Sequence, residues 1–82
     1  MVTHCVKCKS HFYDAIKDGS KTFEVRRNDR CYQKGDFIEL SRTVVTGFIE
    51  NDEKLTRQIT YVLPGGDYGI DPGYVVLGLS RD

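Results

Sequence analysis

The sequence lacks several features that define whole classes of protein. No apolar run approaches the roughly 20 residues that a helix needs to cross a bilayer. Charged residues interrupt the N-terminal stretch, where a secretory signal would be apolar. The three cysteines, an odd number, argue against a disulfide framework. We therefore expect a cytoplasmic protein that has no membrane partner and no structural disulfides.

The chain also lacks repeats, low-complexity segments and linkers. Its 82 residues predict a single domain over 1–82. Hydrophobic residues make up 39% and charged residues 29%, which is a globular composition. Because a chain this short buries only about 60–65% of its unfolded surface, its core must be compact.

Net charge is zero, but the charges are unevenly distributed. Residues 1–30 hold seven Lys and Arg against four Asp and Glu, whereas residues 31–82 hold five against eight. The first part is therefore +3 and the second −3. A neutral protein with one basic side can still hold a polyanion locally. Segregation of this size also arises by chance, so charge alone leaves a basic face open.

Alternating apolar residues predict two early strands. Residues 2–6 would place Val2, His4 and Val6 on one face. Residues 22–27 alternate again, and here we expect the apolar side chains Phe23 and Val25 to point into the core. The other face of this second strand would carry Thr22, Glu24 and Arg26.

Between these strands, the apolar residues are spaced as in a helix. Residues 11–18 predict a short helix with Ser10 as its N-cap. Gly19 suits the position just past the helix end, where a left-handed conformation favours glycine. The apolar face of the helix would carry Phe12, Ala15 and Ile16.

Three further strands are predicted in the second half of the chain. Residues 74–79 are nearly all apolar, which is typical of a closing strand buried on both faces. Residues 46–54 read as a hairpin connection, and 64–73 as a Gly/Pro-rich loop. The strands are expected at 37–45, 56–63 and 74–79.

The expected order is therefore β-α-β-β-β-β, a mostly β fold with one short helix. One helix of this length cannot cover a flat sheet of so many strands. A sheet curled into a small β-barrel, with the helix across one opening or side, is the economical solution.

The first candidate for a functional site is a cluster of histidines and cysteines near the N-terminus. His4, Cys5, Cys8 and His11 are metal-binding residue types, but His4 and Cys5 are adjacent on a strand and would point to opposite faces. A buried cysteine is an equally ordinary small hydrophobe, and nothing marks either thiol as activated. We expect no metal site and no cofactor.

The Gly-rich loop 64–73 lacks the Walker pattern and its lysine, so an NTP cradle is not expected. The ordinary interpretation is a run of turns. An exposed Tyr68 within it could still stack on a base.

The segment 19–30 is the remaining candidate. Lys21, Glu24 and Arg26 would converge if their strand face lines a cleft, offering two cations for phosphate and one carboxylate. The alternative is a half-exposed strand with weak surface ion pairs. Arg27 and Arg30 follow at the strand end and in the turn.

Gly19, Lys21, Glu24 and Arg26 also match the G-x-K-x-x-E-x-R signature of the ASCH domains, a branch of the PUA-like superfamily. Nearly the whole chain resembles a small group of bacterial and phage ASCH-like proteins. The further matching motifs are His4, Lys7 and Cys8, "NDR" at 28–30, "KGD" at 34–36 and "GYVVL" at 73–77.

The resemblance implies a PUA-like β-barrel that binds RNA, or a nucleotide-like ligand, in a cleft beside the first helix. Lys21, Glu24 and Arg26 would line that cleft, with His4 and Lys7 contributed by the neighbouring strand. Arg27 and Arg30 lie outside the signature and are assigned to the ligand by charge and position only.

Two alternatives to RNA binding stay open. Some proteins with a similar fold hydrolyse acetylated cytidine, but they carry threonine where this chain has Glu24, which argues against that activity. A small hydrolase acting on a modified nucleoside, with Lys21 and Glu24 as acid–base pair, is still chemically feasible. A protein partner bound at the barrel edge is the third hypothesis.

Overall fold

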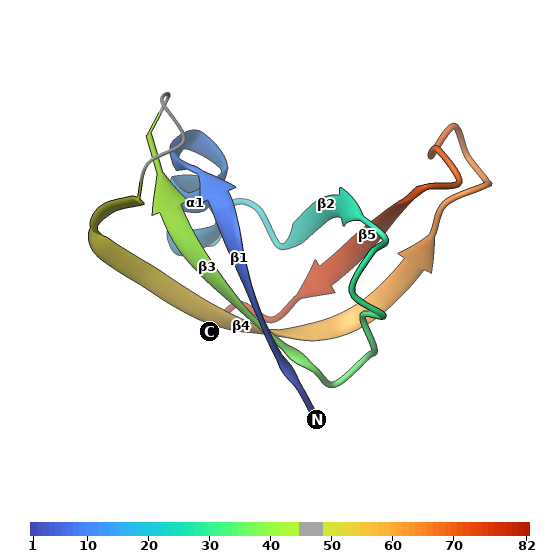
Figure 1. Ribbon diagram of the computed structural model, residues 1–82, viewed down its shortest axis with the longest axis horizontal. Coiled ribbons are helices and arrows are strands. Elements are labelled where there is room, and N and C mark those ends of the chain that lie inside the picture. The colour runs from blue at the N-terminus through green and yellow to red at the C-terminus, as the bar shows by residue number, and fades with distance from the viewer. Residues whose placement is uncertain (45–48) are drawn as a thin grey trace.

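The computed structural model describes residues 1–44 and 49–82, except for the side chains of 49–52. The order β-α-β-β-β-β and the mostly β character are confirmed (Figure 1). The elements are β1 (Thr3–Lys9), α1 (Ser10–Lys17), β2 (Phe23–Arg27), β3 (Phe37–Thr43), β4 (Ile49–Pro64) and β5 (Tyr74–Leu79).

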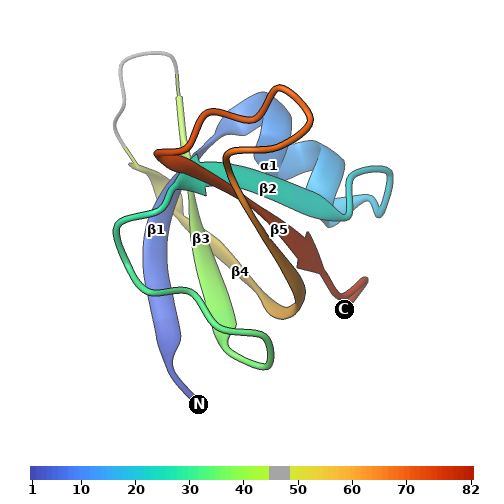
Figure 2. The same ribbon diagram turned by 90° about the vertical axis from the view of Figure 1, so that its right-hand side faces the viewer.

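One sheet contains all five described strands, in the order β1-β3-β4-β5-β2. Strands β1 and β3 are parallel, and the other neighbours are antiparallel. The long β4 belongs to both halves of the sheet, because it pairs with β3 up to Gln58 and with β5 from Ile59 onward. A register shift between Ile59 and Tyr61 marks the change of partner, and the sheet bends strongly there (Figures 1 and 2).

The predicted barrel does not close. Strands β1 and β2 are the two outer strands of the sheet, and no ladder joins them among the described residues. The curl of the sheet brings these two edges to opposite sides of an opening, which we call the seam. Side chains, and not main-chain pairing, bridge this seam.

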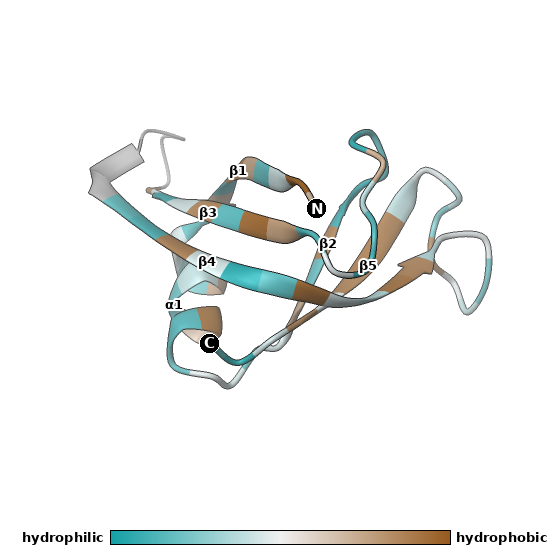
Figure 3. Ribbon diagram, turned by 90° about the horizontal axis from the view of Figure 1, so that it is seen from below, coloured by the Kyte–Doolittle hydropathy of each residue, from teal (hydrophilic) through white to brown (hydrophobic). Residues whose placement is uncertain are grey.

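The core lies inside the curl and under α1. Figure 3 shows apolar residues recurring along β3 and β5, as expected for strands with one buried face. The buried apolar residues are Val6, Cys8, Tyr13, Ile16, Tyr32, Ile38, Leu40, Ile59, Val75, Leu77 and Leu79.

The prediction for the faces of β2 was wrong. Phe23 and Val25 are 46% and 53% exposed, whereas Glu24 between them is only 4% exposed. The inner face of β2 borders the seam, where two cations neutralise the Glu24 carboxylate. Ion pairing therefore allows the polar face to point inward and leaves the apolar pair outside.

Helix α1 differs from its prediction at the start and on its apolar face. It begins at Ser10, so Lys9 occupies the N-cap position and makes no side-chain capping bond. Tyr13 is buried together with Ile16, whereas Phe12 is 41% exposed. No helix of the described chain has the length and apolar character needed to cross a membrane.

The predictions for the end of α1 and for the limits of β5 agree better with the structure. Gly19 has the predicted left-handed conformation, with φ at +88°. Strand β5 has its predicted limits, but only one of its faces is fully buried, because Tyr74 is 39% exposed. The predicted connection 46–54 lies partly outside the described residues, and β4 already begins at Ile49.

Candidate functional site

A buried carboxylate stands at the centre of the seam. One oxygen of Glu24 accepts a hydrogen bond from Lys21 Nζ at 2.8 Å, and the other accepts from Arg26 Nη1 at 3.0 Å. A buried charge is costly unless it is paired and hydrogen-bonded, and both oxygens meet that condition here. The structure thus brings together the three residues that the sequence predicted to converge.

The Lys21 ammonium is fixed by more than Glu24. It donates a second hydrogen bond of 2.7 Å to the carbonyl of Phe23. It also lies 5.0 Å from the ring centre of Phe12 and 4.6 Å from that of Phe23, distances at which a cation is attracted to an aromatic face. Only 14% of the Lys21 side chain is exposed. The cation is therefore held in one place before any ligand arrives.

Arg26 extends across the seam from β2 to β1. Its Nη1 donates to the main-chain carbonyl of Lys7 at 2.8 Å as well as to Glu24. A single nitrogen makes both bonds, so Glu24 and Lys7 do not use the other two nitrogens of the guanidinium. The side chain is 23% exposed and thus reaches solvent at the seam.

These side chains line a surface depression of about 430 Å³, which we call the seam depression. Strands β1 and β2 form its walls, and α1 contributes one aromatic ring. Its lining holds four cations and one carboxylate, so it is net positive. The lining residues are Lys7, Cys8, Lys9, Phe12, Lys21, Phe23, Glu24, Val25 and Arg26.

Cys8 forms part of this lining but has an unreactive thiol. Burial, followed by the negative charge of Glu24, raises the pKa of Cys8 to about 11. The thiol therefore stays protonated at neutral pH, whereas nucleophilic attack and metal binding need the thiolate. Cys8 behaves as the small buried hydrophobe that the sequence offered as one interpretation.

Comparison with known proteins gives the family and no activity. The sequence over residues 3–79 matches the family model of a domain of unknown function (DUF3850). The chain belongs to the DUF3850 family. The match runs from the start of β1 to the end of β5, so the whole seam lies within the DUF3850 domain. A search of curated proteins found no match.

The other predicted ligand residues of this DUF3850 domain divide into three groups. Lys7 lines the seam depression, as expected. Arg27 and Arg30 do not line it, but line a neighbouring depression beyond Arg26. His4 lines neither of these depressions.

His4 instead makes a structural contact at the far end of β1. Its Nε2 lies 2.9 Å from Oδ2 of Asp36, and its ring packs at 4.7 Å from that of Tyr32. Asp36 also accepts hydrogen bonds from the main-chain N–H groups of Val2 and Gln33. His4, followed by these N–H groups, lowers the pKa of the Asp36 carboxyl. The pair fastens the N-terminal end of β1 to the loop before β3.

The metal interpretation finds no geometric support. His4 is buried and the adjacent Cys5 is exposed, so the two point to opposite faces of β1. His11 packs its ring on Phe12, with 4.0 Å between the ring centres. Among the described residues, no group of three or more metal-binding side chains is close enough to share an ion.

Sequence reasoning missed the two aromatic residues of the site. It assigned Phe12 and Phe23 to the core, but both are exposed and flank Lys21. The helical spacing carried no signal against Phe12, because Phe12 and Tyr13 both lie one turn before Ile16 and either could share its buried face.

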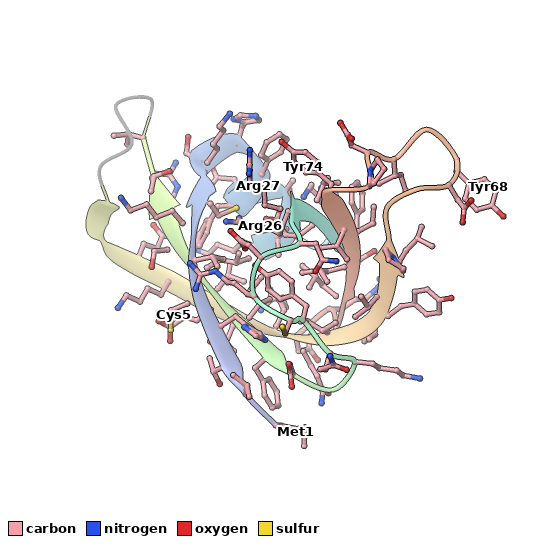
Figure 4. The ribbon with its side chains drawn as sticks, turned by 45° about the vertical axis from the view of Figure 1, so that its right-hand side comes forward. Met1, Cys5, Arg26, Arg27, Tyr68 and Tyr74 are labelled. Carbon is pink, nitrogen blue, oxygen red and sulfur yellow. The ribbon has the colours of Figure 1, made fainter. Side chains whose placement is uncertain are left out.

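Tyr68 does not approach the seam. It is 91% exposed, and Figure 4 shows it at the outer tip of the 64–73 loop, well separated from Arg26. Hydrogen bonds within this loop, such as that from Gly66 N–H to the Ile70 carbonyl at 2.8 Å, give it a defined path. A base stacked on Tyr68 would therefore belong to a different surface.

Proposed function

We propose that this domain binds RNA, or a nucleotide-like ligand, in the seam depression. The observation that carries the proposal is the arrangement of Lys21, Glu24 and Arg26 beside two exposed phenyl rings. The fixed cations suit a phosphate, and the rings suit the face of a base. The resemblance to ASCH domains, which rests on the same residues, supports the proposal.

The size and charge of the depression agree with such a ligand. Its volume of about 430 Å³ falls within the usual range for small-molecule sites, roughly 300–1,000 Å³. Lys7 and Lys9 add positive charge at its β1 wall. A ligand with one planar ring system and at least one negative group would be complementary to this lining.

The pairing of Glu24 favours binding over catalysis. Both of its oxygens already accept hydrogen bonds from cations, and only 5% of the side chain is exposed, so the carboxylate is poorly placed to take a proton from a substrate. Its role in the proposal is to hold Lys21 and Arg26 in position. This arrangement is pre-organised, which lowers the entropy cost of binding.

The test is the binding of a panel of short labelled RNAs, measured by fluorescence anisotropy at low and moderate salt. We expect weak binding whose log K falls with log[salt] by roughly 0.7 for each phosphate neutralised on a single strand. Phe23→Ala, at an exposed position, should weaken binding by about tenfold through lost base stacking.

Two further variants and one control complete the design. Lys9→Ala and Arg26→Ala should each weaken binding, with circular dichroism showing that the fold is kept. Lys34→Ala removes one charge from an exposed position outside the seam lining and should leave binding unchanged. The proposal fails if the seam variants bind the panel as well as the parent protein does.

The hydrolase alternative has one supporting observation, the direct 2.8 Å contact between Lys21 and Glu24. Incubation with acylated and otherwise modified nucleosides, followed by mass analysis, tests it. Turnover that Lys21→Met abolishes would establish an enzyme. A panel without turnover would remove this alternative and leave the binding proposal in place.

A further inference from the structure

A second depression adjoins the seam depression on the other side of Arg26. It measures about 310 Å³, and we call it the tyrosine depression. Val25 and Arg26 line both depressions, so the two are neighbours at the end of β2, with Arg26 between them. The lining residues of the tyrosine depression are Val25, Arg26, Arg27, Asp29, Arg30, Tyr32 and Tyr74.

Two of the three cations that line the tyrosine depression are available to a ligand. Arg27 and Arg30 are exposed, and within the described chain neither side chain has an ion-pair or hydrogen-bond partner. Asp29 is the one carboxylate of the lining, against three arginines. A solvated edge with balanced surface pairs would not leave this excess positive charge in one hollow.

Main-chain pairing places an aromatic ring beside these cations. Tyr74 and Arg27 are directly opposite each other in the β2–β5 ladder, so their side chains share one face of the sheet (Figure 4). The Asn28 N–H donates to the Gly73 carbonyl at 3.0 Å, which fixes both strand ends. Tyr74 is 39% exposed and offers a ring for stacking.

Tyr32 forms the inner wall of the same hollow. Burial raises the pKa of its phenol, and the cations of Arg26 and Arg30, which line the hollow with it, act in the opposite direction. Arg30 also borders a further depression together with Lys7 and Arg26 on the β1 side. Positive charge therefore continues on both sides of Arg26.

We infer that the ligand is a single strand of at least two nucleotides, which occupies both depressions. One base would lie in the seam depression, and the next would stack on Tyr74. The connecting and following phosphates would contact Arg26, Arg27 and Arg30. This inference rests on the proposed function and specifies its substrate class, because a mononucleotide would occupy only one of the two neighbouring depressions.

The experiment compares uridine 5′-monophosphate with di-, tri- and tetrauridylate as competitors against a labelled oligouridylate. We expect affinity to rise by about tenfold or more from the monophosphate to the trinucleotide, the size of effect expected of one further stacked base. The double variant Arg27→Ala/Arg30→Ala should bring the trinucleotide near to monophosphate affinity and should leave the monophosphate within about twofold. It should also reduce the salt slope by roughly 0.7 per lost phosphate contact.

Tyr74→Leu is the second variant, since it keeps an apolar side chain at the start of β5 and removes the aromatic ring. It should weaken trinucleotide binding and spare the monophosphate. Lys34→Ala again serves as the charge control. Equal affinity for all lengths, or equal losses for monophosphate and trinucleotide in the double variant, would overturn the inference alone. If neither monophosphate nor oligonucleotide binds, the inference and the proposed function both fail.

Discussion

The guanidinium of Arg26 donates a 2.8 Å hydrogen bond to the main-chain carbonyl of Lys7, across the seam between β2 and β1. Strand β1 is an outer strand of the sheet, and among the described residues no strand pairs with its outer edge. An arginine side chain thus occupies a place that a neighbouring strand would fill in a closed barrel. The same side chain lines the proposed ligand site, so Arg26 contributes to the stability of the fold and also to the proposed binding.

Arg26→Ala should lower the free energy of unfolding by about 2 kcal/mol, because hydrogen bonds to charged groups contribute roughly 1.5–3 kcal/mol each. Urea denaturation followed by circular dichroism measures the change. Arg27→Ala removes the same charge one residue later, at an exposed site, and should change stability by no more than about 0.5 kcal/mol. Equal stabilities for the two variants would show that Arg26 does not support the seam.

Glu24→Ala should be the most damaging change at the seam. It leaves Lys21 and Arg26 without their shared partner, and breaking a buried ion pair typically costs about 3–5 kcal/mol. The matched control is Glu39→Ala, whose partner Lys54 is 3.9 Å away and half exposed. That surface pair should contribute less than about 1 kcal/mol. Similar losses in the two variants would contradict a special role for Glu24.

Asp36 should make the stability of the domain depend on pH. His4, followed by the Val2 and Gln33 N–H groups, lowers the folded-state pKa of Asp36 below its usual 3.8. Its stabilising effect is therefore complete above the unfolded-state pKa and is lost as pH falls through the folded-state value. Asp36→Asn should be less stable than the parent at about pH 6, and the difference should narrow in acid. Denaturation curves at several pH values test this, and a constant difference would contradict it.

The three free cysteines should separate into two classes. Cys5 and Cys31 are exposed, whereas burial raises the pKa of Cys8 to about 11. A disulfide reagent at about pH 8 should therefore titrate two thiols in the native protein and the third only after unfolding, because the thiolate is the reacting species. Cys8→Ala should remove the third thiol, which reacts only after unfolding. Three equally fast thiols would show that Cys8 is not protected.

Alternation in the sequence revealed β2 but not which of its faces points inward. Because side chains alternate along a strand, Glu24 and Arg26 lie on one face of β2 and Phe23 and Val25 on the other. The apolar character of Phe23 and Val25 predicted that their face points into the core. That choice was wrong, because the inner face of β2 ends at an open seam, where an ion-paired carboxylate is stable. The opposite wall of the seam is β1, where Arg26 reaches the Lys7 carbonyl 19 residues earlier in the chain, so no local pattern contains this information.

The sequence predicted correctly those features that depend on neighbouring residues only. Gly19 ends α1 with the left-handed conformation that its position predicted, and the limits of β5 are those of the apolar run 74–79. Closure of the sheet depends on how far β4 bends between its two sets of partners. That bend follows from pairings between distant segments, and for this reason the sequence did not show that the expected β-barrel stays open between β1 and β2.

Among the described strands, the 16-residue β4 alone pairs in both halves of the sheet. Without β4, strand β3 would lose a pairing partner in one half and strand β5 would lose one in the other. The domain therefore cannot be divided into two parts that fold independently. A break or insertion within β4 would disconnect the wall containing Lys7 from the wall containing Arg26. Added residues are better accommodated at the exposed tip of the 64–73 loop, which makes that tip the natural place for a label or a fused tag.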